Sequence, residues 1–206
     1  MEKVIEEIDI GDIRMNMFNK LPYFVILQGK KYKINVDFRN MISFEQKLQD
    51  KSTNNSEKIE YGLRHFYPAF FYAENYLKLL QQPKLYKEAC DKLIWFYKCG
   101  REDYHKVSGN GKGKKELVYS YEHDDEYIWG AFHELHNIDL TVDKVHWWKF
   151  KAILKSLPSN TEFVKIQGYR VYDGKDEDLK KLKEYWTLPK PQTEQERLNK
   201  IYELLK

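Results

Sequence analysis

The spacing of apolar and polar residues along this chain predicts a mainly α fold with one small β-hairpin near the N-terminus. Two β-rich runs, Tyr23 to Leu27 and Tyr32 to Val36, flank a turn that contains glycine. They place the hairpin at about residues 21–36. Beyond Asp37 the apolar residues recur every three or four positions, which is the spacing of an amphipathic helix.

Capping residues and prolines indicate where the helices begin. Ser56 is expected to cap one helix, and Pro83 suits the first turn of another. A further helix should begin near Asp124, where acidic side chains favour the positive end of the helix dipole. Thr141 is expected to cap the helix that carries a doubled tryptophan.

These elements predict one domain over residues 1–175, followed by a C-terminal helical tail over residues 176–206. The stretch at about 101–117 is expected to be a mobile loop, because its glycines and lysines leave little to bury. Residues 161–170 fit either a short helix or an extended segment. The tail's last helix carries an apolar stripe that is a candidate contact for another subunit, formed by Leu198, Ile201 and Leu205.

The composition is that of a folded chain with a very polar surface. Aromatic residues make up 16% of its 206 residues, which is too many for a disordered protein, although 33% of residues are charged. The net charge is only +3, so binding to nucleic acid would have to come from a local patch. Cys90 and Cys99 fit no disulfide framework, and no apolar run is long enough to span a membrane. A cytoplasmic location is therefore expected.

The candidate nucleic-acid-binding patch is the basic loop, in which lysines lie among glycines. Its sequence fails the P-loop pattern, because Lys115 follows Gly113-Lys114 where serine or threonine is needed, and no strand precedes it. Two interpretations stay open: a solvated loop, or a segment that becomes ordered on nucleic acid or on an acidic partner. The lysines of this loop are Lys106, Lys112, Lys114 and Lys115.

No motif for a catalytic nucleophile or a bound cofactor is present, so we expect no enzyme activity and no cofactor. His133 and His136 lie one helical turn apart and could chelate a metal if His123 or His146 supplied a third ligand. Their spacing is not that of a zinc peptidase helix. We interpret them as surface histidines and predict no metal site, with a metal-dependent enzyme as the alternative.

The doubled tryptophan, Trp147-Trp148, is the most distinctive feature of the chain. Large rings belong either to a packed core or to a surface that binds another protein. Consecutive helical positions diverge by ~100°, so at least one of the two rings is expected to reach the rim of the core or a partner. The candidate residues for folding or for partner binding are these two with Phe150, Trp129 and Phe132.

Two words of the sequence are highly specific: W-F-Y-x-C-G at Trp95 to Gly100, and H-W-W-K-F at His146 to Phe150. Further words occur at 36–39, 44–45, 119–122, 124–127, 138–140 and 168–170. In this order, and over about Leu21 to Arg170, they resemble a bacteriophage family. The family is named for a gene-product-fifteen protein of long-tailed phages that infect Gram-positive hosts.

The resemblance implies a protein encoded between the major tail protein and the tape-measure protein, which is the usual place of tail assembly chaperones. Such chaperones keep the tape-measure protein soluble while tail-tube subunits polymerise along it, and they are absent from the finished virion. The implied protein is a non-enzymatic chaperone of the host cytoplasm whose partner is the tape-measure protein. Further candidate partners are the major tail protein, a shorter companion chaperone and a second copy of the chain. Binding to nucleic acid through the basic loop is the alternative function.

Overall fold

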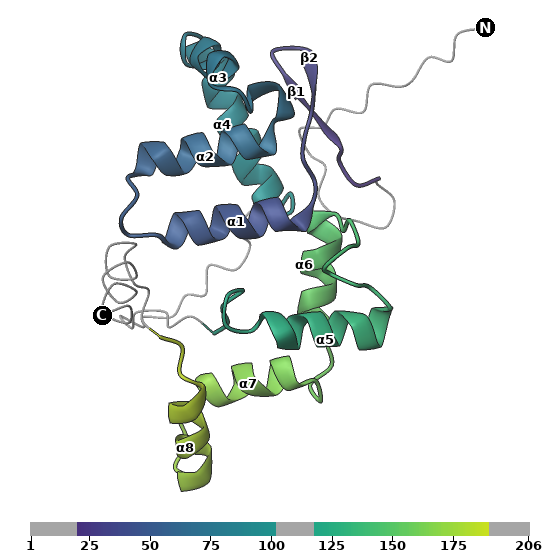
Figure 1. Cartoon of the computed structure of the whole chain (residues 1–206), viewed down its shortest axis with the longest axis vertical. Coiled ribbons are helices and arrows are strands. Elements are labelled where there is room, and N and C mark those ends of the chain that lie inside the picture. Colours follow the sequence, from purple (N-terminus) through teal and green to yellow (C-terminus); the bar gives the residue numbers. More distant parts are fainter. Residues whose placement is uncertain (1–19, 102–117, 190–206) are drawn as a thin grey trace, which may run out of the picture. The chain divides into compact units, whose positions relative to one another are not determined.

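The computed structural model describes residues 20–101 and 118–189 of the chain. Within those ranges the chain forms two compact units: unit 1 takes residues 20–48 and 53–101, and unit 2 takes residues 49–52 and 118–189. Eight α-helices, one short 3₁₀ helix and one antiparallel hairpin make up the regular structure of the described residues (Figure 1). The predicted fold class is therefore confirmed. The predicted division into a domain and a tail stays a prediction.

The predicted hairpin is present in unit 1, where β1 (Phe24–Leu27) pairs antiparallel with β2 (Lys30–Lys33). Gln28 and Gly29 form the turn, and both have positive φ angles, 47° and 73°. A two-residue turn of this kind has a twist that matches the twist of the two strands. Alternate residues of β1 are buried, so one face of the hairpin covers the core of unit 1 and the other is exposed.

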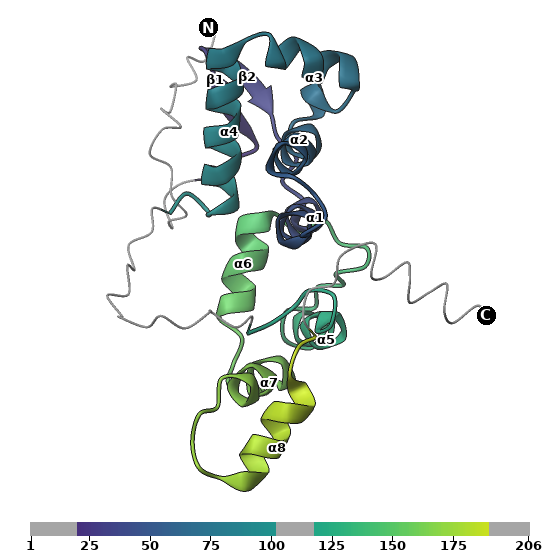
Figure 2. The same cartoon turned by 90° about the vertical axis from the view of Figure 1, so that its left-hand side faces the viewer.

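Four α-helices and a short 3₁₀ helix complete unit 1, and Figures 1 and 2 both show α1 and α2 side by side. The cap predicted at Ser56 is wrong, because the Asn54 side chain accepts the Glu57 N–H at 2.9 Å and α2 begins one residue later. The sequence pattern also gave no sign of α3. The elements are α1 (Phe38–Gln49), α2 (Asn55–Phe66), η2 (Pro68–Phe70), α3 (Ala73–Leu80) and α4 (Pro83–Tyr97).

Gly62 lets α2 approach its neighbours closely in the core of unit 1. A Cβ atom at this position would lie 2.5 Å from Phe44 Cε2 of α1 and 2.8 Å from Leu93 Cδ2 of α4. Gly130 of unit 2 is the matched control, because a Cβ atom there would meet nothing within 4 Å.

Gly62→Ala is expected to destabilise the protein by about 1–3 kcal/mol, because the added methyl group overpacks a dense core. Gly130→Ala should stabilise it by about 0.5–1 kcal/mol, because alanine is the better helix former and has room. Urea unfolding followed by circular dichroism measures both. Equal effects of the two substitutions would show that α2 does not pack closely at Gly62.

Unit 2 consists of four helices, and its α5 begins directly after Asp124, as predicted. Of residues 161–170, which the sequence left open, 162–170 form a helix and Thr161 is its N-cap residue. Figures 1 and 2 both show α5 and α7 side by side. The cap predicted at Thr141 is wrong: α6 begins six residues later, and the His146 Nδ1 atom caps it by accepting the Trp148 N–H at 3.1 Å. The elements are α5 (Asp125–His136), α6 (Trp147–Lys155), α7 (Glu162–Arg170) and α8 (Glu177–Trp186).

A buried ion pair between Asp124 and Arg170 joins the elements of unit 2. The Arg170 guanidinium donates two hydrogen bonds of 2.7 Å to the two carboxylate oxygens of Asp124. It also donates to the backbone carbonyls of Trp186, at the end of α8, and of Val118. The start of α5 and the ends of α7 and α8 thus meet at one arginine.

No helix in the described residues has the length and apolar character needed to cross a membrane.

Candidate interaction surface around Trp129

Helix α5 presents Trp129 on its outer face. Ile128 and Phe132 of this helix are buried, whereas the Trp129 side chain is 38% exposed. His133 and His136 follow at four and seven residues, so they share the outer face with Trp129, and both are exposed. A large exposed ring among polar neighbours is a typical anchor for a protein partner.

The Trp129 ring is fixed in place by two contacts. Its face stacks on His133, with ring centroids 5.0 Å apart and planes 17° apart. Its Nε1–H donates to Asp139 Oδ1 at 3.1 Å. A side chain held in one orientation loses little entropy on binding, which favours affinity. We call Trp129, His133 and Asp139 the Trp129 surface.

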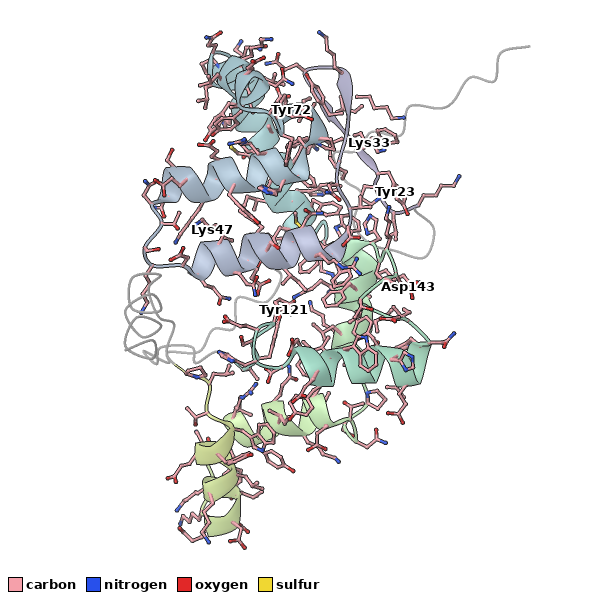
Figure 3. The ribbon with its side chains drawn as sticks, viewed as in Figure 1. Tyr23, Lys33, Lys47, Tyr72, Tyr121 and Asp143 are labelled. Atoms are coloured by element: carbon pink, nitrogen blue, oxygen red, sulfur yellow. The ribbon has the colours of Figure 1, made fainter. Side chains whose placement is uncertain are left out.

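The loop after α5 holds the Asp139 carboxylate at the edge of the indole, where it accepts the Nε1–H. Asn137 ends the helix in the left-handed conformation, with φ 50°. Asp139 Oδ1 accepts from the Thr141 N–H at 2.8 Å and from its hydroxyl at 2.6 Å, and Asp143 Oδ2 accepts the Asp139 N–H at 2.8 Å. Figure 3 labels Asp143 on this loop. Val142 of the same loop is 73% exposed. It adds apolar surface directly after Thr141, which holds Asp139.

These hydrogen bonds lower the pKa of Asp139 to about 2, with the Thr141 hydroxyl as the largest cause, followed by the Thr141 N–H and the Trp129 indole. An unfolded aspartate titrates at about 3.9. The stabilisation from the ionised carboxylate is therefore complete above about pH 4 and is lost as the pH falls through about 2.

An NMR titration is expected to show the Asp139 carboxyl carbon and the Trp129 indole N–H signals moving together, with a midpoint near pH 2. Thr141→Val should raise that midpoint, because the hydroxyl donor is lost while the backbone donor stays. A midpoint near the ordinary value for aspartate in the unchanged protein would contradict the hydrogen-bonded loop.

Of the predicted partner-binding residues in α5 and α6, Trp129 is exposed and the other four are buried. Phe150 stacks on Phe132, with centroids 5.0 Å apart, and on Trp147, with centroids 5.9 Å apart. The expectation that Trp147 or Trp148 reaches the rim is wrong, because they are 0% and 1% exposed. These four rings are core residues.

Lysine and tyrosine side chains cover Trp147 where the sequence predicted a rim. The Lys151 Nζ atom lies 5.1 Å from a Trp147 ring centroid and donates to the Tyr119 and Tyr121 hydroxyls at 3.1 and 3.3 Å. Both tryptophans lie at the start of α6, and other residues of the fold cover both rings.

The remaining predicted site residues lie outside the described residues. They are Leu198, Ile201 and Leu205 of the tail and Lys106, Lys112, Lys114 and Lys115 of the basic loop. The metal alternative gains no third ligand in the described parts: among residues 20–101 and 118–189, no three His, Cys, Asp or Glu side chains are placed to hold an ion.

Sequence reasoning missed the roles of Asp139 and His133 in holding Trp129. A local signal for Asp139 was available, because an Asp two residues before a Thr favours a turn in which the carboxylate accepts backbone and hydroxyl hydrogens. His133 lies four residues after Trp129, which is the spacing at which helical side chains stack. The Asp124–Arg170 pair is 46 residues apart in sequence and had no such signal.

The family model described as Bacteriophage Gp15 protein matches residues 17–194 of the chain. This range contains both described units. Neither a curated protein nor a solved structure matches.

Proposed function

This chain belongs to the bacteriophage Gp15 family, and from that premise we propose that it is a tail assembly chaperone that binds the tape-measure protein. The activity is binding without catalysis, and it takes place in the host bacterial cytoplasm. The protein then leaves, so it is absent from the mature virion. A tail-tube subunit, a shorter companion chaperone and a second copy of the chain are its further proposed partners.

The observation that carries this proposal is the exposed and fixed Trp129 ring. A tape-measure protein is long, and its apolar stretches need to be covered before the tube assembles around it. Trp129 offers an apolar face without conformational freedom, flanked by the polar atoms of His133 and Asp139. Such an anchor binds an amphipathic helix by its apolar side and leaves the polar side in water.

Coexpression with a tape-measure protein tests the proposal. The chain is expected to keep the tape-measure protein soluble and to copurify with it. Trp129→Ala should reduce the copurified amount at least about tenfold, because tryptophan anchors dominate the binding free energy of an interface. Tyr185→Ala is the matched control, since Tyr185 is a 77% exposed aromatic residue of the same unit.

Two outcomes would contradict different parts of this proposal. A tape-measure protein that is equally soluble without the chain rules out the chaperone function. A Trp129→Ala variant that copurifies as well as the Tyr185→Ala variant rules out the Trp129 surface as the binding site and leaves the chaperone function in place.

A further inference from the structure

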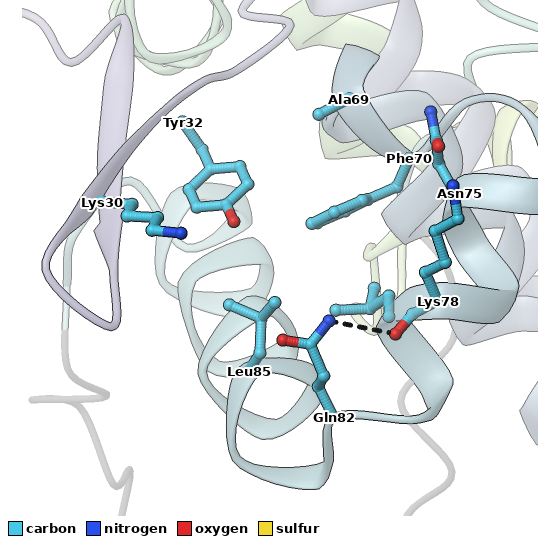
Figure 4. A pocket seen from close by; sticks show the side chains of 9 residues that line it. Lys30, Tyr32, Ala69, Phe70, Asn75, Lys78, Gln82 and Leu85 are labelled. Carbon is cyan, nitrogen blue, oxygen red and sulfur yellow. Dashed lines mark hydrogen bonds between the residues drawn. The ribbon is translucent and has the colours of Figure 1, made fainter.

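A hollow in unit 1 opens beside β2 (Figure 4). Its volume is about 310 Å³, which is within the range of sites that take a small ligand or a side chain. Leu79 and Leu85 line its interior, and the rings of Tyr32 and Phe70 lie beside it with centroids 5.6 Å apart. The remaining described residues that line it are Lys30, Lys78, Ala69, Asn75 and Gln82, and none of these is acidic.

The outer edge of β2 has backbone groups that are not bonded to any residue that the structure describes. Ile34 N–H donates to the Tyr23 carbonyl at 3.1 Å, so residues 23 and 34 are a hydrogen-bonded pair. Bonded and non-bonded pairs alternate along an antiparallel ladder, which makes Lys31 and Lys33 members of non-bonded pairs. Their N–H and C=O groups therefore point away from β1, and no residue within 20–101 or 118–189 bonds to them.

The hollow lies beside the same strand, β2, that carries this edge. Two β2 residues, Lys30 and Tyr32, line the hollow, whereas no β1 residue does, so the hollow lies on the side of β2 that faces away from β1. Figure 4 shows both side chains pointing from the hairpin toward Phe70. Lys31 and Lys33 alternate with them and lie on the exposed face of the hairpin, where Figure 3 labels Lys33.

The positive charge of the hairpin favours an acidic strand as the one that pairs with the edge of β2. Residues 20–34 contain four lysines and no acidic residue. A second copy of β2 would place lysines opposite lysines, which is unfavourable, and lysines on an edge strand guard against such pairing. An acidic strand would pair favourably with β2, because each of its carboxylates would face a lysine ammonium group.

We propose that β2 binds an extended segment of a partner protein in which acidic and apolar residues alternate. The segment adds to the sheet through backbone hydrogen bonds to Lys31 and Lys33. Its carboxylates lie on the exposed face against the two lysine side chains, and an apolar side chain enters the hollow beside Tyr32 and Phe70. The proposed strand-binding site consists of residues of unit 1 alone and does not include the Trp129 surface.

Fluorescence anisotropy with a labelled octapeptide of alternating glutamate and valine tests the pattern. The full chain is expected to bind it at least about tenfold more tightly than an isomer in which all glutamates precede all valines. The double substitution Lys31→Glu, Lys33→Glu should weaken binding at least about tenfold, and Lys87→Glu, an exposed lysine of α4, should not. Equal binding of the two peptides overturns the proposal.

Amide hydrogen exchange tests the backbone contact independently of side-chain charge. Adding the alternating octapeptide should slow exchange at Lys31 and Lys33 and leave Tyr32 unchanged, because the Tyr32 amide is already in the ladder. Unchanged exchange at Lys31 and Lys33 overturns the proposal.

A segment of this chain could occupy the edge of β2 in place of a partner, because Glu7-Ile8-Asp9-Ile10 also alternates acidic and apolar residues. Hydrogen exchange distinguishes the two cases. Slow exchange at Lys31 and Lys33 without peptide, abolished by Glu7→Lys, Asp9→Lys, would assign the edge to the chain itself. That result overturns a partner in trans.

Discussion

Arg170→Met is expected to lower the free energy of unfolding by about 3–5 kcal/mol, because it leaves the Asp124 carboxylate buried without its counter-charge. The Asp124 and Arg170 side chains are 1% and 7% exposed, so water cannot take over the lost interaction. The substitution also frees the carbonyls of Val118 and Trp186. Urea unfolding followed by circular dichroism measures the loss.

Lys165→Met is the matched control on the same helix. Lys165 pairs with Glu162 at 3.3 Å, but both side chains are about half exposed, so its loss should cost at most about 0.5 kcal/mol. The double variant Asp124→Asn, Arg170→Met should lose less than the sum of the two single losses, because either change already breaks the pair. Additive losses, or a loss for Arg170→Met as small as the control's, would contradict a coupled buried pair.

Local patterns predicted the elements whose cause is local. The hairpin follows from a glycine turn between two β-rich runs, and the start of α5 follows from Asp124 and the acidic residues after it. The cap predicted at Thr141 is wrong although its signal is local, because the Thr141 hydroxyl donates to Asp139 in a turn that does not lead directly into a helix. Asp139 and Thr141 form a turn with each other, and α6 begins six residues after Thr141 with His146 as its cap.

Features that depend on distant residues could not be predicted in this way. Helix α3 is two turns long and buries only Tyr76 and Leu79, so its pattern is too short to indicate a helix. The burial of both Trp147 and Trp148 depends on which residues cover α6, including Lys151, Tyr119 and Tyr121 around Trp147. The sequence segments that carry the family resemblance include Trp147, Asp124 and Arg170. The structure places Trp147 in the core of unit 2, and it pairs Asp124 with Arg170 in the buried ion pair.

Trp147→Ala is expected to destabilise the protein by about 3–5 kcal/mol, because it removes a fully buried ring that stacks on Phe150 and leaves a cavity. Trp129→Ala should cost less than about 1 kcal/mol, since that ring is partly exposed and loses one hydrogen bond and one stacking contact. Urea unfolding followed by circular dichroism compares the two without relying on tryptophan fluorescence.

Comparing the Trp129→Ala and Trp147→Ala variants distinguishes a residue that binds the partner from a residue that only stabilises the fold. If Trp129 is the anchor, Trp129→Ala loses the tape-measure protein while its own unfolding midpoint stays near that of the unchanged chain. Trp147→Ala loses the partner only in proportion to the unfolded fraction, so a stabilising change such as Gly130→Ala should increase the amount that copurifies. A folded Trp147→Ala variant that still fails to bind would show that the buried ring reaches the partner, and the division between core and surface drawn from its 0% exposure would be wrong.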